Sequence, residues 1–236
     1  MKQPFEDAAQ ARKSLARRLA AMAVVAGAMY ANPAAAATLC YAGHNPASSS
    51  TVTGNLEVVA NNSCTLQGVT VTGNVNVDAG AMLDASNTTI KGNLNALNPA
   101  RVSVFDGTVG GDGNFGDGSA EEASFVCGTH FMGSVTVKGA NGASNPGAWI
   151  SGGDEKGLAV KCNGVAIDGS LYIRNNTGEV RIYVSTIKGS VSIQTNFNEV
   201  DVEDNKIGGD LTCNGNTTAP DHSGNTIGGR AYGQCL

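Results

Sequence analysis

A five-residue motif, in which a glycine is followed by alternating polar and apolar residues, returns along the chain at a nearly constant distance. Its glycine recurs every 19 residues in the first half of the chain and every 20 residues near the C-terminus. The clear copies begin at Gly54, Gly73, Gly92, Gly133, Gly169, Gly189 and Gly209. A period of about 20 residues with strand-like alternation predicts a solenoid whose turns are built from short stacked strands.

The alternation assigns an inner and an outer face to each strand. With the glycine as position zero, positions −2, +2 and +4 are nearly all aliphatic, and positions +1 and +3 are mostly small and polar. We expect the first set inside and the second in solvent. The glycine itself is expected at a corner, with a backbone φ that other residues avoid.

Residues directly after the glycine are expected to stack as a ladder of amides from turn to turn. A weaker copy of the motif, Gly113-Asn114-Phe115, is aligned with the others by its glycine. The predicted ladder begins with Asn55, Asn74, Asn93 and Asn114. A further strand is expected halfway round each turn, as at 101–104, 180–184 and 200–204.

The pattern over roughly 50–235 resembles secreted bacterial right-handed parallel β-helix repeat proteins of uncharacterised function. The ending carries much of the likeness, with Ile207–Asn216 followed by Gly224–Gly229 and Gly233-Gln-Cys235. More distantly, the pattern is similar to bactofilin-like and pectate-lyase-like β-solenoids. The resemblance implies an all-β chain folded as a single right-handed parallel β-helix, with no known reaction attached to it.

The repeat length also predicts the dimensions of the solenoid. We predict about 20 residues per coil, eight to nine coils over 38–236, disulfide-stapled ends, and an insertion at about 139–166, where the period is interrupted.

The N-terminal 37 residues have the organisation of a signal peptide. Basic residues precede an apolar stretch over 19–30, which is short for a bilayer span, and small residues at 35–37 offer a cleavage site. We therefore expect 1–37 to be removed from an exported bacterial protein that works outside the cell, at its surface or in the periplasm.

The charge balance excludes several classes of partner. The chain carries 15 Lys and Arg against 20 Asp and Glu, and without 1–37 the balance becomes 10 against 18, a net charge of −8. Nucleic acids and anionic membrane surfaces both require clustered cations, so neither is expected as a partner. No membrane insertion is expected after removal of the signal peptide.

Six cysteines, all beyond the predicted signal peptide, indicate disulfides in an oxidising compartment. Once an insertion between 139 and 166 is allowed for, their spacings place them in three pairs that are each about one coil apart, within reach of a disulfide bond. The predicted pairs are Cys40 with Cys64, Cys127 with Cys162, and Cys213 with Cys235.

One group of charged residues suggests an enzyme. Glu179 and Glu199 are one coil apart, and Arg181 is expected beside Asp201. Neighbouring carboxylates can hold a cation or share a proton. The competing interpretation is an ordinary ion pair between coils beside two solvated glutamates.

A glycine-rich acidic segment is a candidate for loose calcium binding, although it fits neither the nonapeptide repeat nor the EF-hand spacing. Its possible ligands are Asp112, Asn114, Asp117, Glu121 and Glu122. A flexible acidic loop without metal is the alternative. Otherwise we expect no cofactor.

The sequence thus favours a secreted, monomeric and non-enzymatic β-helix that serves as a structural or ligand-recognition module, with a carbohydrate or another surface protein as partner. The alternative is a calcium-dependent polysaccharide lyase or hydrolase acting around 179–201. End-to-end polymerisation is a third hypothesis, because the ends of a solenoid present unpaired strand edges.

Overall fold

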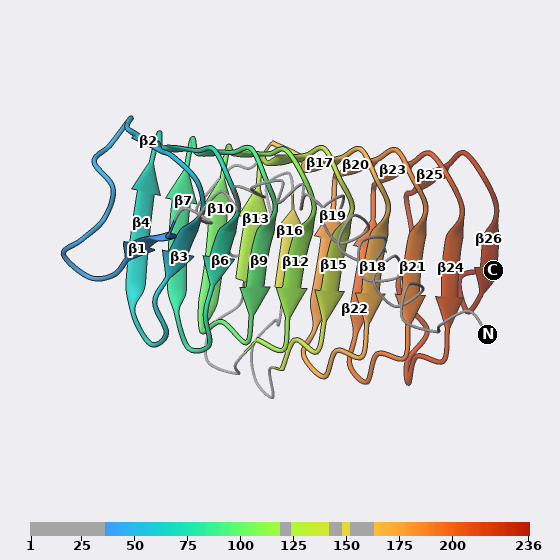
Figure 1. Ribbon diagram of the computed structural model, residues 1–236. Coiled ribbons are helices and arrows are strands. Elements are labelled where there is room, and N and C mark those ends of the chain that lie inside the picture. The colour runs from blue at the N-terminus through green and yellow to red at the C-terminus, as the bar shows by residue number, and fades with distance from the viewer. Residues whose placement is uncertain (1–35, 119–123, 142–147, 152–162) are drawn as a thin grey trace, which may run out of the picture. The chain divides into compact units, whose positions relative to one another are not determined.

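The structure of the protein, a computed structural model, describes residues 36–118, 124–141, 148–151 and 163–236. All but the last two residues of the predicted signal peptide lie outside these ranges. Residues Ala36–Leu236 form one compact unit, and its described part contains strands and turns but no helix. The strands wind into a parallel β-solenoid (Figure 1).

Three sheets make up the walls of the solenoid, and we call them sheets A, B and C. Sheet A has ten strands: β1 (Thr38–Cys40), β3 (Leu56–Val58), β6 (Val75–Val77), β9 (Leu94–Leu97), β12 (Gly113–Gly116), β15 (Val135–Lys138), β18 (Leu171–Arg174), β21 (Val191–Gln194), β24 (Leu211–Asn214) and β26 (Ala231–Gly233). Sheet C has seven: β4 (Ser63–Gln67), β7 (Met82–Ser86), β10 (Arg101–Phe105), β13 (Ser124–Cys127), β16 (Ala148–Ser151), β19 (Val180–Tyr183) and β22 (Val200–Glu203).

Sheet B consists of nine two-residue strands, one for each coil. They are β2 (Thr51–Val52), β5 (Thr70–Val71), β8 (Thr89–Ile90), β11 (Thr108–Val109), β14 (His130–Phe131), β17 (Ala166–Ile167), β20 (Thr186–Ile187), β23 (Lys206–Ile207) and β25 (Thr226–Ile227). The chain passes from sheet B across the motif glycine into sheet A, then through sheet C and back to B. The solenoid therefore has about nine coils of about 20 residues, as predicted.

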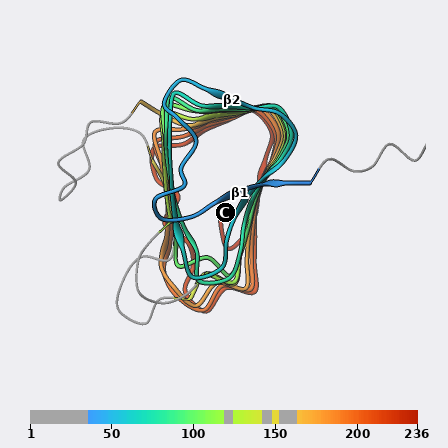
Figure 2. The ribbon, with the colours of Figure 1, turned by 60° about the vertical axis from the view of Figure 1, so that its left-hand side comes forward.

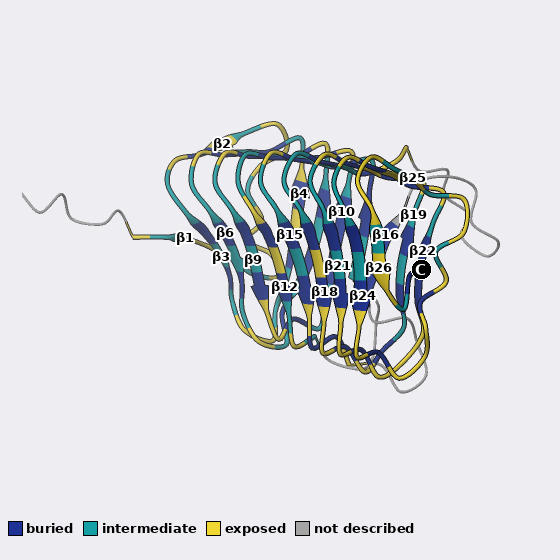
Figure 3. Cartoon of the chain, turned by 90° about the vertical axis from the view of Figure 1, so that its right-hand side faces the viewer, coloured by how far each residue is buried: buried dark blue, intermediate teal, exposed yellow. Residues whose placement is uncertain are grey.

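Alternating burial along most strands fills the inside of the coils with aliphatic side chains (Figure 3). The residues predicted to point inward are buried, among them Leu56, Ile90, Ile173 and Ile187, each at most 1% exposed. Fully burying one such side chain stabilises the fold by roughly 1.5–3 kcal/mol. Because parallel strands stack in register about 4.8 Å apart, each of these side chains also packs on its equivalents in the neighbouring coils.

The motif glycines serve a different purpose from the one expected. Only Gly54 has a left-handed φ (87°), whereas the glycine that starts each of the later coils has none. In those coils a Cβ would overlap the side-chain oxygen at position +1 of the preceding coil, as at Gly73 with Asn55 and at Gly189 with Ser170. Glycine is therefore required because a larger residue would displace the hydrogen-bonding side chain at position +1 of the preceding coil.

The fifth coil corrects the predicted alignment by two residues. Gly113 pairs with Leu94 and Val135, so it stands at position +2, and the motif glycine of this coil is Gly111. The ladder residue is accordingly Asp112 rather than Asn114: Asp112 N–H donates to Asn93 at 2.8 Å. Asn114 instead lies at position +3 on the outer face.

A glycine at an inner position of the fifth coil is explained by the next coil. Phe131, which is completely buried, stands where other coils have Val or Ile. A Cβ on Gly113 would lie 2.6 Å from Cε1 of Phe131. The Phe131 ring also packs edge-on against Phe115, with ring centroids 6.4 Å apart. The large and the small residue therefore compensate each other in one layer of the core.

A second amide ladder, which the sequence analysis missed, lies inside the coils where sheet A turns into sheet C. Asn176, Asn196 and Asn216 are at most 7% exposed. Each side-chain amide donates to the next one at 2.8–3.0 Å, and Gln234 forms the last step. The side-chain oxygens also accept the backbone N–H of the preceding asparagine, so the buried polar groups of this corner are satisfied.

Disulfides hold both ends of the solenoid, as predicted. Cys40–Cys64 and Cys213–Cys235 are formed, and all four residues are at most 1% exposed. Figure 2 shows the C-terminus inside the outline of the coils, where Cys235 anchors it. Cys127 is disulfide-bonded too, but its predicted partner, Cys162, lies outside the described residues.

The predicted insertion falls in the longest coil, in which 36 residues separate the registered pair His130 and Ala166. β16 lies within this stretch and pairs with both β13 and β19. Part of the predicted insertion is therefore an ordinary strand of sheet C, and the extra residues lie on either side of it.

Changing Gly113 to Ala should destabilise the protein by about 1–3 kcal/mol, because the new methyl group meets the ring of Phe131. In a Phe131→Val background the same substitution should cost much less, because only the 3.2 Å approach of the new Cβ to Cε2 of Phe115 remains. Urea unfolding of the two single variants and the double variant measures this coupling. Equal costs of Gly113→Ala in both backgrounds would contradict the assigned packing.

Replacing Val184 with Asn should stabilise the protein by roughly 1 kcal/mol. Val184 has a φ of 48°, which is unfavourable for a β-branched residue, and its side chain is 47% exposed. Asn87 and Asp204 occupy the same corner in other coils with similar φ values of 49° and 53°. Thermal unfolding checks the gain, with Val59→Asn, at a residue without positive φ, as the control that should show none.

Candidate functional site

The predicted acid–base group lies on the outer face of sheet C, near its C-terminal end. β19 and β22 place Arg181 in register with Asp201, as expected. The guanidinium of Arg181 hydrogen-bonds the carboxylate of Glu179, and its Nε lies 3.7 Å from Oδ2 of Asp201. Tyr183, which the sequence analysis missed, donates its hydroxyl to the same Asp201 oxygen at 2.9 Å. The sequence could have identified Tyr183, because it lies two residues after Arg181 and therefore faces the same side of the strand.

Burial dominates the electrostatics of this group. Asp201 is only 9% exposed, and desolvation raises the pKa of its carboxyl, although the hydrogen bond from Tyr183 and the charge of Arg181 act in the opposite direction. Desolvation and the neighbouring Asp201 likewise raise the pKa of Tyr183. For Arg181, desolvation lowers the pKa, but the hydrogen bond to Glu179 and the nearby negative charges raise it overall. Arg181 is thus a fixed cation.

The four predicted residues are only partly brought together. Glu179, Arg181 and Asp201 form one network, while the side chain of Glu199 is exposed and forms no ion pair with a described residue. The expected pairing of Glu179 with Glu199 across one coil is replaced by the contact between Glu179 and Arg181. What the sequence suggested as a cation site is here a carboxylate–guanidinium–carboxylate–phenol network.

Two further acids extend this face toward the last coil. Asp221 pairs with Asp201 through an isolated backbone β-bridge, and the pKa of the Asp221 carboxyl is lowered mainly by the N–H of Ser223. The hydroxyl of Ser223 donates to Glu203 at 2.8 Å, yet desolvation and the adjacent Asp221 raise the pKa of Glu203 overall. Among the described residues, no three His, Cys, Asp or Glu side chains come together as ligands for a metal ion.

The calcium candidates are distributed along one coil. Asp112 lies at the corner, where its Oδ1 accepts the N–H of Ser134 at 2.8 Å. Asn114 lies on sheet A and donates to Asn95 at 2.9 Å, and Asp117 occupies the next corner with a φ of 47°. Glu121 and Glu122 lie outside the described residues. The described members therefore have separate roles in coil stacking.

Sheet B carries a small charged group. Asp168 accepts hydrogen bonds from Nζ of Lys188 at 2.8 Å and from Nε2 of His130 at 3.0 Å, and these bonds lower the pKa of Asp168. All three side chains are at least 30% exposed. No hydroxyl or thiol nucleophile is hydrogen-bonded to His130 in the described residues, so this is a surface ion-pair group.

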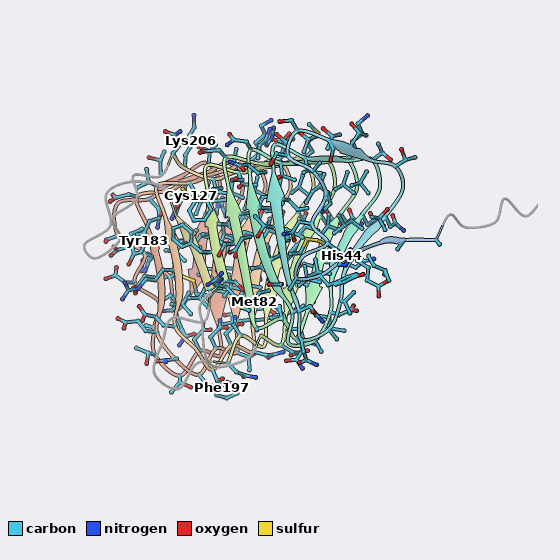
Figure 4. The ribbon with its side chains drawn as sticks, turned by 90° about the vertical axis from the view of Figure 1, so that its left-hand side faces the viewer. His44, Met82, Cys127, Tyr183, Phe197 and Lys206 are labelled. Atoms are coloured by element: carbon cyan, nitrogen blue, oxygen red, sulfur yellow. A yellow bond between two sulfur atoms is a disulfide. The ribbon has the colours of Figure 1, made fainter. Side chains whose placement is uncertain are left out.

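At the N-terminal end, the loop after β1 borders an open recess of about 770 Å³. Its walls include Tyr41 and His44, whose rings stack with centroids 4.2 Å apart, and Thr51 and Thr53 of the first coil. Figure 4 shows His44 and Tyr183 at opposite ends of the solenoid, so the recess and the sheet C network are separate.

The outer face of sheet A is hollowed at Gly116. Neighbouring coils carry Leu97 and Lys138 at the equivalent position, and the missing side chain leaves a shallow hollow of about 250 Å³. We call it the sheet A hollow; it is lined by Asn95, Ala96, Leu97, Asn114, Phe115, Gly116, Thr136 and Lys138.

Polar side chains border the sheet A hollow on one side, and cationic side chains lie next to it on the other. Asn114 donates to Asn95, which donates to Asn76, so the outer amides form a ladder of their own. Beyond Thr136 and Lys138, the next strand presents Tyr172 and Arg174 in register with them. The sequence analysis did not select these residues. They could have been selected because they occupy the outward positions +3 and +5 after the motif glycines Gly133 and Gly169.

No protein-family model, curated protein or solved structure matches this chain. In the residues that the structure describes, no helix is long and apolar enough to cross a membrane. The buried disulfides indicate folding in an oxidising environment.

Replacing Asp201 with Asn tests the electrostatics of the sheet C network. Because burial raises the pKa of Asp201 in the folded state, the wild type loses stability as pH rises through that raised pKa, and Asn does not. The free energy of unfolding of the variant minus that of wild type should therefore become more positive as the pH is raised from below 3.8 to neutral. Urea unfolding across this range measures it.

Tyr183→Phe provides the matched comparison for this measurement. It removes a hydrogen bond that favours the Asp201 carboxylate, so the pKa of Asp201 should rise further and the loss of stability with pH should become steeper. Identical pH profiles for wild type, Asp201→Asn and Tyr183→Phe would show that folding does not raise the pKa of Asp201.

Proposed function

We propose that this protein is an exported, non-enzymatic recognition module that binds an extended saccharide ligand along the outer face of sheet A. The observation that carries the proposal is the sheet A hollow, which adjoins outward amides, hydroxyls and cations on adjacent strands. Ligand sites combine a concave surface with a few convergent polar groups, and this face provides both.

The state of the sheet C network supports a binding function rather than catalysis. Arg181 is held by Glu179 and Asp201, and Asp201 also accepts from Tyr183. A general base must be free to reach a substrate proton, and a fixed cation must face the developing charge. In this network each charged group is already directed at another protein group, which favours a structural role.

The middle strands of sheet A favour side-chain recognition. Each has a parallel partner on both sides, so its backbone groups are engaged within the sheet. A ligand on this face meets the amides of Asn95 and Asn114, the hydroxyl of Thr136 and the ring of Tyr172. Amides, hydroxyls and an exposed aromatic ring are suited to a hydroxyl-rich partner.

Filling the hollow should weaken binding without unfolding the protein. A Cβ on Gly116 would lie 3.4 Å from Cδ1 of Leu97, an ordinary contact, so Gly116→Leu should fold as wild type does. We expect wild type to bind members of an oligosaccharide panel in calorimetric titration and Gly116→Leu to lose at least about tenfold in affinity, equivalent to about 1.4 kcal/mol.

The matched control is Thr89→Leu, which adds an apolar side chain to the outer face of sheet B and should leave affinity unchanged. The same panel should yield no cleaved product with or without calcium. Product formation that disappears in Asp201→Asn would refute the non-enzymatic proposal and support the lyase or hydrolase alternative. No binding to any saccharide would refute saccharide recognition.

A further inference from the structure

Two cations lie side by side next to the sheet A hollow. Lys138 of β15 and Arg174 of β18 are register partners, and both side chains are exposed on the outer face of the sheet. Neither forms an ion pair with a described carboxylate. No other register pair among the described strands brings together two cations.

This arrangement costs stability unless something neutralises it. Partners on adjacent strands are about 4.8 Å apart, and like charges placed directly opposite each other in a sheet repel. The same outer row continues to Gly116 on one side and Gln194 on the other, so within this row no acid lies next to the two cations. In a chain of net charge −5, such a pair is a local exception that is complementary to an anionic ligand.

The neighbours of the cations narrow the class of anion. Tyr172 lies two residues before Arg174 on the same face and is 42% exposed, which leaves a flat ring for stacking. On the other side, the hollow itself is mainly apolar, and the amides of Asn95 and Asn114, which are hydrogen-bonded to each other, lie at its rim. Aromatic ring, amides and paired cations together fit a ligand that carries hydroxyls, a flat apolar surface and carboxylates.

We propose that the sheet A hollow and the adjacent Lys138, Arg174 and Tyr172 bind a carboxylated oligosaccharide, one built from uronate residues. The carboxylates lie against Lys138 and Arg174, a sugar ring stacks on Tyr172, and hydroxyls bond the amides at the rim of the hollow. This identifies the ligand class of the proposed function and rests on it.

An acidic peptide fits the face less well. An extended peptide that binds a sheet normally adds a strand at an edge, where backbone groups are unpaired. β12, β15 and β18 are in the middle of sheet A, whose edges are β1 and β26. The face offers a peptide only side-chain contacts, with Leu97 as the exposed apolar group of the hollow.

The test compares three ligands by calorimetric titration at low ionic strength. They are a uronate hexasaccharide, the same hexasaccharide with its carboxyl groups reduced to alcohols, and hexaglutamate. Wild type should bind the uronate most tightly, and this affinity should fall as salt is added. Equal affinity for the uronate and its reduced form, or tighter binding of hexaglutamate, would overturn the proposal.

The variants test the residues. Lys138→Gln and Arg174→Gln should each weaken uronate binding about tenfold or more, because each removes a charge-assisted hydrogen bond, and should barely affect the reduced form. Lys206→Gln, an exposed cation on sheet B, should change nothing (Figure 4). Unchanged uronate binding in Lys138→Gln and Arg174→Gln would overturn the proposal.

A second readout does not depend on the ligand. Without ligand, Arg174→Gln should have a higher melting temperature than wild type at low salt, since the repulsion from Lys138 is relieved, and the difference should shrink at high salt. A lower melting temperature at low salt would show that Arg174 is already neutralised by the protein, against the proposal. If the reduced hexasaccharide binds and Gly116→Leu prevents it, the proposed function stands even where the uronate preference fails.

Discussion

The structure depends on how the solenoid satisfies backbone N–H groups at its corners, where the strand ladders are interrupted. At the corner between sheets B and A, the side-chain oxygen at position +1 of one coil accepts the N–H of the equivalent residue in the next. These bonds are exposed or partly buried, and each contributes roughly 0.5–1.5 kcal/mol, repeated in every coil. The corner therefore restricts position +1 to Asn, Asp and Ser in every coil that another coil follows. It also restricts that next coil to glycine at position zero, because a Cβ would occupy the place of the accepting oxygen.

This coupling explains why so much of the fold could be predicted from the sequence. A corner that demands glycine and a small acceptor leaves a visible motif, and an inner face that demands aliphatic residues leaves a visible alternation. The disulfides at the two ends followed from the same period, since Cys40 and Cys64, like Cys213 and Cys235, are about one coil apart. The motif alone did not reveal why glycine is needed: at most corners it provides space, whereas its backbone flexibility is used only at Gly54.

The errors arose where packing, rather than the motif, determines the alignment. The fifth coil was misaligned because Gly113 lies at an inner position that is normally aliphatic, and only the Phe131 ring in the following coil explains that choice. The buried ladder of Asn176, Asn196 and Asn216 was overlooked because asparagine in a turn has many roles in a sequence. Likewise, the partnership of Glu179 with Arg181 on one strand, instead of with Glu199 across a coil, depends on side-chain conformation, which no spacing encodes.

The same constraints locate where this chain is free to vary for function. Inner positions are fixed by packing and corner positions by hydrogen bonds, so within the described coils the outward positions of the three sheets are the ones left free for specificity. On sheet C those positions form a closed network around Asp201, and on sheet B Asp168 is paired with Lys188 and His130. On sheet A, the outward row lacks a side chain at Gly116 and places Lys138 beside Arg174, two choices that add nothing to coil stacking. Residues that oppose the stability of an otherwise regular repeat are best explained by what they bind.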